Sequence, residues 1–341
     1  MATSLFSNGY ALIIAVNDNR NPAYALPAVG RDATALRDVL VHPRRCAYPP
    51  GNVRLLLGSA ATRAGIQAGL AWLRERITAD QSGNATAILF YSGHGVYSPG
   101  DRSYYLLPYD TSAPLAASLL RATDLAAEIE QVQPRRLLVA LDCCHAGGMG
   151  AKGEVVGAET LESIAIPAAL FMTGAKGVSP AEGSKGQEML AQGSGRAVLS
   201  SSQTGQLSWI RKDRAMSIFT YHLIEALTGH AQPQDGASEV LVSDVMSYVW
   251  RKVPKSALAD CNATQEPDYQ VSGNFPVALL LGGKGLSKGQ PAPDPLDRMA
   301  ETGAQIIYGD RVGGDKIVIG DVSDSVIAVG RGAKARKTTR G

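Results

Sequence analysis

The chain has 341 residues, enough to bury one large core or two medium ones, and its content of 45% hydrophobic and 19% charged residues is that of a globular protein. The chain contains no run of eighteen apolar residues, so no membrane span is predicted. Residues 325–341 carry five basic side chains and no acidic one, so the other 324 residues sum to −3 within a net charge of +2. This balance excludes a general basic surface for nucleic acid on the body of the protein.

Strands and helices are predicted to alternate along most of the chain. Apolar runs without polar alternation are typical of parallel strands covered on both faces, and they occur at 10–16, 53–57, 86–91, 136–142 and 197–201. Helices are predicted at 31–41, 62–80 with Thr62 as N-cap, 123–132 with Thr123 as N-cap, 217–230 and 241–253. This order predicts an α/β fold with a mostly parallel central sheet flanked by helices.

Two later segments differ in composition. Residues 148–195 are rich in Gly, Ala, Ser and Lys and predict a long linker inside a main domain of residues 1–282. After a second linker at 283–302, residues 303–341 repeat short Ile/Val pairs between Gly and Asp. That repeat predicts a small tail of β-hairpins with a basic end.

The cysteines and the first residues bear on the compartment. Cys46, Cys143, Cys144 and Cys261 are too few and too scattered for a disulfide framework, so thiols in a reducing compartment are expected. No basic segment precedes the first apolar run, which argues against a signal peptide. We therefore expect a cytoplasmic protein that associates with neither membrane nor nucleic acid.

Two predicted strands end in reactive residues. His94 follows the strand 86–91 in "YSGHG", and Cys144 follows the strand 136–142 in "DCCHAGG". Active sites of open parallel sheets form beyond the carboxyl ends of the strands, so neighbouring strands would bring thiol and imidazole into one crevice. The imidazole would activate the thiol for attack on a carbonyl, whose oxygen the N–H groups of Gly95 and Cys144 could bind.

Other interpretations of these residues remain open. A buried cysteine more often packs as a small hydrophobe, and a histidine between glycines can simply cap a turn. A zinc site of Cys143, Cys144, His145 and His94 is disfavoured because adjacent cysteines cannot easily ligate one tetrahedral ion. The missing C-x-x-C spacing also argues against a thioredoxin-like redox pair, and neither glycine-rich turn matches a phosphate loop. The thiol–imidazole dyad is the favoured prediction.

Together, "YSGHG" and "DCCHAGG" resemble the His and Cys boxes of caspase-like cysteine peptidases, specifically the metacaspase and bacterial orthocaspase branch. The 50-residue separation of His94 and Cys144 matches the caspase signature. The resemblance covers about residues 8–282 and implies a caspase-haemoglobinase-like fold, with a large part of about 1–147 and a small part of about 196–282. It also implies that Cys144 is the nucleophile and His94 the base, which leaves Cys143 as a packing residue.

The same resemblance implies a specificity pocket built from Asp32, Ser92 and Asp142. Two converging carboxylates would pair with an Arg or Lys side chain of a protein or peptide substrate. For Asp32 the alternative is a charge at a helix N-terminus, which favours the helix dipole. Self-cleavage at basic residues of the 148–196 loop is one expectation, and an uncut surface loop is the other.

The chain departs from this branch where many of its members bind calcium. The expected Asp-Asp pair is reduced to Asp124, the expected later acid is Ala151, and Asp101 and Asp110 are more simply turn residues. We therefore expect no cofactor and no calcium dependence. Two alternatives to an enzyme remain: a caspase-fold scaffold or effector module recruited by a regulatory partner through the tail 303–341, and a metal-binding regulator.

Overall fold

The computed structural model describes residues 5–112, 118–143, 154–156, 159–163, 165–172, 195–213, 215–231 and 237–281, and gives 154–156 and 159–163 as backbone alone. The chain divides into two units, Met1–Ala292 and Pro293–Gly341, and every described residue belongs to the first. The predicted linker 283–302 and the predicted tail 303–341 lie outside the described residues.

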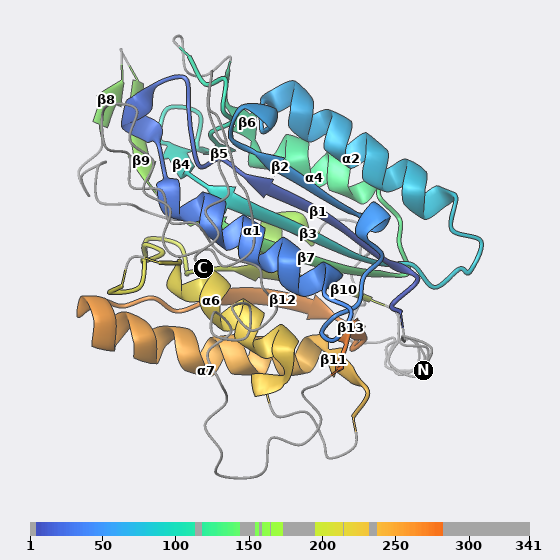
Figure 1. Cartoon of the computed structure of the whole chain (residues 1–341). Helices are drawn as coiled ribbons and strands as arrows, with labels where there is room; N and C mark the ends of the chain where they lie inside the picture. The colour runs from blue at the N-terminus through green and yellow to red at the C-terminus, as the bar shows by residue number, and fades with distance from the viewer. Residues whose placement is uncertain are drawn as a thin grey trace, which may run out of the picture. The chain divides into compact units, whose positions relative to one another are not determined.

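A six-stranded sheet forms the centre of the first unit (Figure 1). Its strands, in spatial order, are β12 (Asp268–Ser272), β10 (Gly195–Ser200), β7 (Arg136–Cys143), β3 (Thr86–Gly93), β1 (Gly9–Ala15) and β2 (Val53–Leu57). All neighbours are parallel except β12, which runs antiparallel to β10. The five predicted strands are the five parallel ones, so the prediction of a mostly parallel α/β sheet is confirmed.

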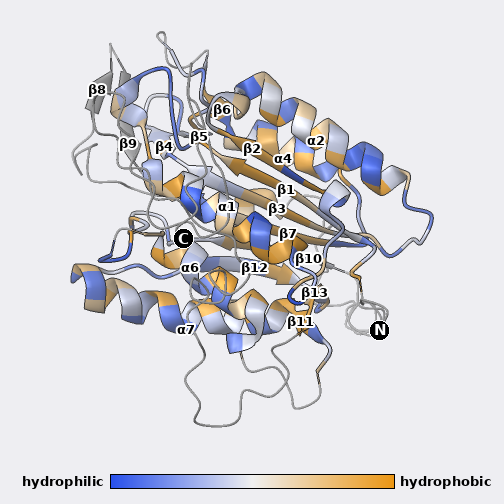
Figure 2. Ribbon diagram, in the orientation of Figure 1, coloured by the Kyte–Doolittle hydropathy of each residue, from blue (hydrophilic) through white to orange (hydrophobic). Residues whose placement is uncertain are grey.

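Helices cover both faces of this sheet. The helices α2 (Arg63–Thr78) and α4 (Ala122–Glu130) pack on one face, where they bury the odd-numbered side chains of β3 and β7. On the other face lie α1 (Pro27–Val41) and α6 (Ile218–Glu225), and α7 (Val242–Cys261) packs along α6. Figure 2 shows apolar strands between helices that each carry apolar and polar stripes, as a two-sided core requires.

The predicted helix ends were right in one case and wrong in another. Thr62 caps α2, since its hydroxyl accepts a hydrogen bond from the Gly65 N–H at 2.9 Å. Thr123 does not cap α4, which begins at Ala122 with Arg121 in the N-cap position. Arg121 is extended there because it pairs with Tyr105 in a β-ladder, so strand pairing sets this helix start.

The later helices also differ from the prediction. The segment 217–230 divides into α6 and a π-helical turn, η5 (Ala226–His230), which contains Gly229 at φ 96°. The helix predicted at 241–253 continues through Pro254 to Cys261 as α7. None of the helices in the described ranges is long and apolar enough to cross a membrane.

A second sheet, absent from the predictions, lies next to the end of β3. It contains β6 (Leu120–Arg121), β5 (Ser103–Leu106), β4 (Gly95–Ser98), β9 (Glu159–Ser163) and β8 (Glu154–Val156), in that spatial order. The strands β8 and β9, with the short helix η4 (Ala168–Phe171), fall inside the segment expected as the first linker. Phe171 of η4 is buried in the main core. A last pair, β11 (Glu239–Leu241) and β13 (Pro276–Leu279), closes the described chain.

Candidate active site

The two strands that carry the reactive residues are neighbours. In the parallel ladder of β3 and β7, Ser92 pairs with Asp142 and Gly93 pairs with Cys143. His94 is the residue after Gly93, and Cys144 is the residue after Cys143. The two strands are therefore neighbours, as the predicted dyad requires, whereas Cys144 itself and His145 lie outside the described residues.

The glycine before His94 is required by a side chain packed against it. A Cβ atom on Gly93 would lie 2.7 Å from the Tyr91 hydroxyl oxygen and 3.2 Å from the Val16 Cβ. The Tyr91 hydroxyl lies there because it donates a hydrogen bond to the His94 carbonyl oxygen at 3.1 Å. The ring of Tyr91 thus supports the point where the chain leaves the central sheet and enters β4.

His94 is held in place by a backbone carbonyl that the sequence did not point to. The ring is 3% exposed, and its Nε2 lies 3.1 Å from the carbonyl oxygen of Tyr24, the last residue of the short helix η1 (Pro22–Tyr24). A carbonyl oxygen only accepts, so Nε2 carries the proton and Nδ1 carries the lone pair of the neutral ring. The ring of Tyr24 stands edge-on to the imidazole, with centroids 6.2 Å apart.

Cys143 has the environment of a packing residue. Its side chain is 5% exposed and belongs to the core between the sheet, α2 and α4. Burial, with a smaller contribution from Asp142, raises the pKa of the Cys143 thiol to about 12. A thiol with that pKa is protonated at neutral pH and is a poor nucleophile. Of the two adjacent cysteines, Cys143 is therefore unsuited to attack a carbonyl.

Asp32 and Asp142 come together at the N-terminus of α6. Both side chains are fully buried. Asp32 accepts a hydrogen bond from the Ser217 N–H at 3.0 Å, and Asp142 accepts one from the hydroxyl of the same serine. Ser92, fully buried and paired with Asp142 in the ladder, belongs to the same face of the sheet. The structure thus brings the three predicted pocket residues to one place.

The alternative role of Asp32 as a charge at a helix start does not fit this structure. The helix α1 begins at Pro27, so Asp32 lies in its second turn and not at its N-terminus. Burial raises the pKa of the Asp32 carboxyl well above its usual range, and the nearby Asp142 carboxyl raises it further. The Ser217 N–H and the Arg31 guanidinium oppose this shift with smaller effects.

The hydroxyl groups around Asp142 were missed by the sequence analysis. Besides Ser217, Ser208 donates to the carboxylate at 2.8 Å and Thr220 donates at 2.7 Å. Ser217 is also the N-cap of α6, where its oxygen accepts from the Thr220 N–H at 3.0 Å. A serine and a threonine three residues apart at the start of an apolar helix were the available signal, but nothing in the sequence linked them to Asp142.

A family comparison agrees with this arrangement. The model of the caspase domain matches residues 8–275. The chain belongs to the caspase-domain family. The predicted resemblance to caspase-like cysteine peptidases is thereby confirmed at the level of the family, and with it the fold class and a cysteine-type peptidase as the coarse function. No curated protein matches the chain closely enough to count as a relative.

In this caspase domain, Gly95 opens β4 directly after His94. The Leu107 N–H donates to the His94 carbonyl oxygen at 3.2 Å, next to the ladder pair Gly95–Leu106. Hydrogen-bonded and non-hydrogen-bonded pairs alternate in an antiparallel ladder. Gly95 therefore occupies a non-hydrogen-bonded position, and its N–H faces away from β5.

The acidic residues considered for calcium have other roles where the caspase domain is described. Asp101 pairs with the Arg121 guanidinium at 2.9 Å and accepts from the Tyr105 hydroxyl. Asp110 accepts from the Arg63 N–H at the first turn of α2. Asp124 lies in the first turn of α4, and Ala151 lies outside the described residues. Within the described part, no three His, Cys, Asp or Glu side chains cluster in a way that could hold a metal ion.

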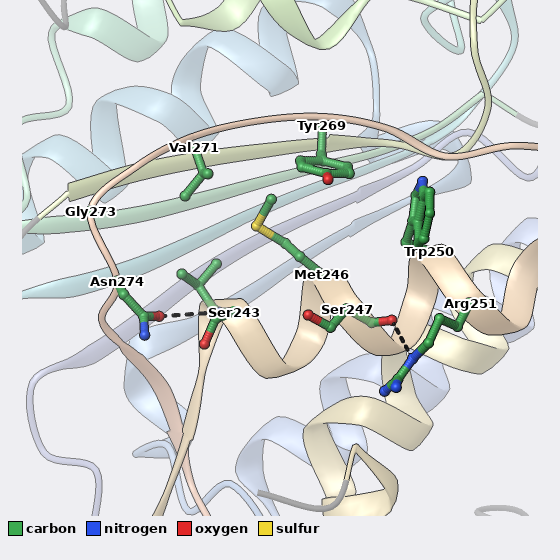
Figure 3. A pocket seen from close by; sticks show the side chains of 10 residues that line it. Ser243, Met246, Ser247, Trp250, Arg251, Tyr269, Val271, Gly273 and Asn274 are labelled. Atoms are coloured by element: carbon green, nitrogen blue, oxygen red, sulfur yellow. Dashed lines mark hydrogen bonds between the residues drawn. The ribbon is translucent and has the colours of Figure 1, made fainter. Parts of the chain in front are cut away.

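A separate groove lies between α7 and β12 (Figure 3). Its volume is about 540 Å³, and Met246 points from α7 toward β12 along its floor. Three large apolar side chains around it are exposed: Trp250 by 53%, Tyr269 by 42% and Val271 by 46%. None of the predicted site residues lines this groove.

Proposed function

We propose that the caspase domain is a cysteine endopeptidase that cleaves peptide bonds after arginine or lysine. Cys144 is the nucleophile and His94 is the base. The observation that carries this proposal is the register of β3 and β7, in which Gly93 pairs with Cys143 and Ser92 pairs with the buried Asp142 one residue earlier. This register supports a dyad formed by the next residue of each strand.

The orientation of the His94 ring defines its part in the reaction. Nε2 is occupied by the Tyr24 carbonyl oxygen, so Nδ1 takes the proton from the Cys144 thiol. The thiolate attacks the substrate carbonyl, and the N–H groups of Gly95 and Cys144 bind the oxygen that becomes negative. The imidazolium then protonates the leaving amine, and water hydrolyses the acyl-enzyme.

The acidic pair supports the preference for a basic side chain. Oδ2 of Asp32 is buried and has no hydrogen-bond partner among the described residues. A guanidinium offers five N–H donors and an ammonium three, and neither group has an acceptor. An Asp substrate would instead bring a third carboxylate to the pocket, which like-charge repulsion disfavours. Burying the carboxylates of Asp32 and Asp142 costs desolvation free energy, and a scaffold would gain nothing from them. We therefore prefer the enzyme to the scaffold.

For self-processing, the structure bears on one candidate position. Arg196 belongs to β10, where it pairs with Leu137 of β7 and Ser272 of β12. A peptide bond inside a central ladder is a poor substrate, because a protease needs an extended and accessible chain. Within the proposal, self-cleavage is therefore expected at Lys152, Lys176 or Lys185, which lie outside the described residues, and not at Arg196.

The proposal is tested with fluorogenic peptides that end in Arg, Lys or Asp. Wild type is compared with Cys144→Ala and with the matched variant Cys143→Ala, each with calcium and with a chelator. Cleavage after Arg and Lys that persists in the chelator and in Cys143→Ala, and disappears in Cys144→Ala, is the expected result. Cleavage after Asp would overturn the pocket. Activity in Cys144→Ala equal to that of wild type would overturn the assignment of Cys144 as nucleophile. No cleavage of any peptide in any sample would favour the recruited scaffold.

A further inference from the structure

The proposed preference for Arg or Lys does not say how many charges Asp32 and Asp142 carry before a substrate binds. We propose that the substrate-free pocket keeps one proton on Asp32, and that an arriving arginine or lysine side chain displaces this proton to solvent. Ser217 is the positioning residue that ties Asp32 and Asp142 together. This inference rests on the proposed Arg/Lys pocket and assigns a proton exchange to it.

Two carboxylates lie close together in this buried site. Asp32 and Asp142 are both 0% exposed, and both are hydrogen-bonded to Ser217. One uses the backbone N–H and the other the hydroxyl. Two negative charges that are bound to the same buried residue repel each other strongly, because the effective dielectric constant there is low. A proton on one of the two carboxylates removes this repulsion.

The hydrogen bonds of the two carboxylates differ, and this difference determines which residue holds the proton. Asp142 accepts from three hydroxyl groups, those of Ser208, Ser217 and Thr220, and these bonds stabilise its ionised form. Asp32 accepts one backbone N–H on Oδ1, and its Oδ2 has no hydrogen-bond partner in the described part of the chain. The ionised form of Asp32 is the less stabilised of the two, so the proton belongs to Asp32.

The other charged group that acts on Asp32 does not change this assignment. Arg31 precedes it on α1, but the Arg31 Nε donates to the Ala215 carbonyl oxygen at 2.8 Å. Its electrostatic effect on Asp32 is smaller than that of burial and of Asp142. From α6, the groups at the pair are the neutral Ser217 and Thr220.

The exchange balances in atoms and charge. A protonated Asp32 carboxyl and a free guanidinium or ammonium become an ion pair, and one proton passes to the buffer. The guest supplies the positive charge that the proton supplied before, and its N–H donors reach the oxygen that lacked one. At a pH below the raised pKa of Asp32, each binding event therefore releases one proton.

Ser217 holds the pair at a fixed distance because one residue serves both carboxylates and also caps α6. Removing its hydroxyl leaves the N–H bond to Asp32 but takes a donor from Asp142. We expect Ser217→Ala to raise KM for Arg peptides about tenfold with kcat little changed, since a lost hydrogen bond to a charged group costs about that factor. Ser217→Thr keeps a capping hydroxyl and is expected to restore KM.

The experiment uses the full chain with Cys144→Ala, so that binding is measured without cleavage. A blocked peptide ending in Arg is titrated by calorimetry at pH 6 in buffers of different ionisation enthalpy, and the dependence of the heat on buffer gives the protons released. The matched protein carries Asp32→Asn in addition, which leaves His94 as it was. The matched ligand ends in citrulline, which has the shape of Arg without its charge.

About one proton released by the Arg peptide, and none in Asp32→Asn or with citrulline, is the expected result. Tight binding without proton release overturns the exchange and leaves the Arg/Lys pocket standing. Failure of the Arg peptide to bind overturns the pocket itself. An infrared difference spectrum of the ligand-free proteins tests the proton without any ligand. The carbonyl band of a protonated carboxyl must be present in the protein that has Asp32 and absent from Asp32→Asn, and its absence from both overturns the proposal.

Discussion

At the carboxyl ends of β3 and β7, two carboxylates are buried among hydroxyl groups, whereas around the groove between α7 and β12 three large apolar side chains are exposed to solvent. The two regions differ because β7 is a central strand covered on both faces and β12 is an edge strand. A buried charge needs partners from distant segments, and here they come from α6 and from the loop before it. An exposed apolar side chain needs no partner and costs little. Function should therefore depend on the first region, and the second should affect only stability.

The largest expected effect is that of Asp142→Ala. The change leaves the three hydroxyl groups of Ser208, Ser217 and Thr220 without their shared acceptor. We expect the free energy of unfolding to fall by ~3 kcal/mol or more, and kcat/KM on Arg peptides to fall at least ~100-fold. Chemical denaturation and peptide kinetics measure the two quantities. Ser208→Ala, which removes one donor, is the control at ~1 kcal/mol. If the free energy of unfolding did not change in Asp142→Ala, the three hydroxyl groups would not depend on Asp142 as their acceptor, and the prediction would be wrong.

Asp32→Asn is expected to move activity and stability in opposite directions. The pKa of Asp32 is raised in the folded chain, so its stability contribution is complete below the ordinary pKa of about 3.9 and is lost as pH rises through the raised value. The variant should match wild type near pH 4 and exceed it by a margin that grows as pH rises toward the raised pKa, while cleavage after Arg falls. Denaturation curves over a pH series test this. A wild type that is more stable at every pH would show that the Asp32 carboxylate stabilises the fold.

Met246→Ala is expected to affect stability alone. Met246 lies on the floor of the α7–β12 groove and is 7% exposed. Shortening it should lower the free energy of unfolding by ~2–3 kcal/mol, because packing contacts and burial are lost, with kcat/KM per folded molecule unchanged. Thermal unfolding and active-site titration together measure this. Met246→Leu, which conserves volume, should cost less than ~1.5 kcal/mol. A fall in kcat/KM would mean that the two regions are coupled.

Trp250→Ser is expected to have the smallest effect. The side chain is 53% exposed at the rim of the groove. Stability should stay within ~0.5 kcal/mol of wild type and peptide cleavage should not change. The same denaturation and kinetic measurements suffice. Loss of cleavage of a protein substrate, with peptide cleavage intact, would instead show that the groove takes part in recognition.

The predictions succeeded where a local pattern carried the information. Each parallel strand was visible as a short apolar run, because strands covered on both faces need apolar residues at every position. The edge strand β12 was missed because its sequence, DYQVS, is polar and mostly exposed. The second sheet was missed for a similar reason. Its strands are two to five residues long and pair only with one another.

By itself, the sequence of this chain determined the strand–helix order, the position of Cys144 and His94 just after two strands, and the family resemblance. The order and the positions follow from local apolar patterns, and the resemblance rests on the motifs YSGHG and DCCHAGG and their spacing. Only the tertiary structure decided that β3 and β7 are neighbours with Ser92 facing Asp142, and that the Tyr24 carbonyl orients His94. It also decided that Ser217 joins Asp32 to Asp142, across 185 and 75 residues of chain. Such contacts follow from how buried polar groups find donors once the chain is folded, and no local pattern records them.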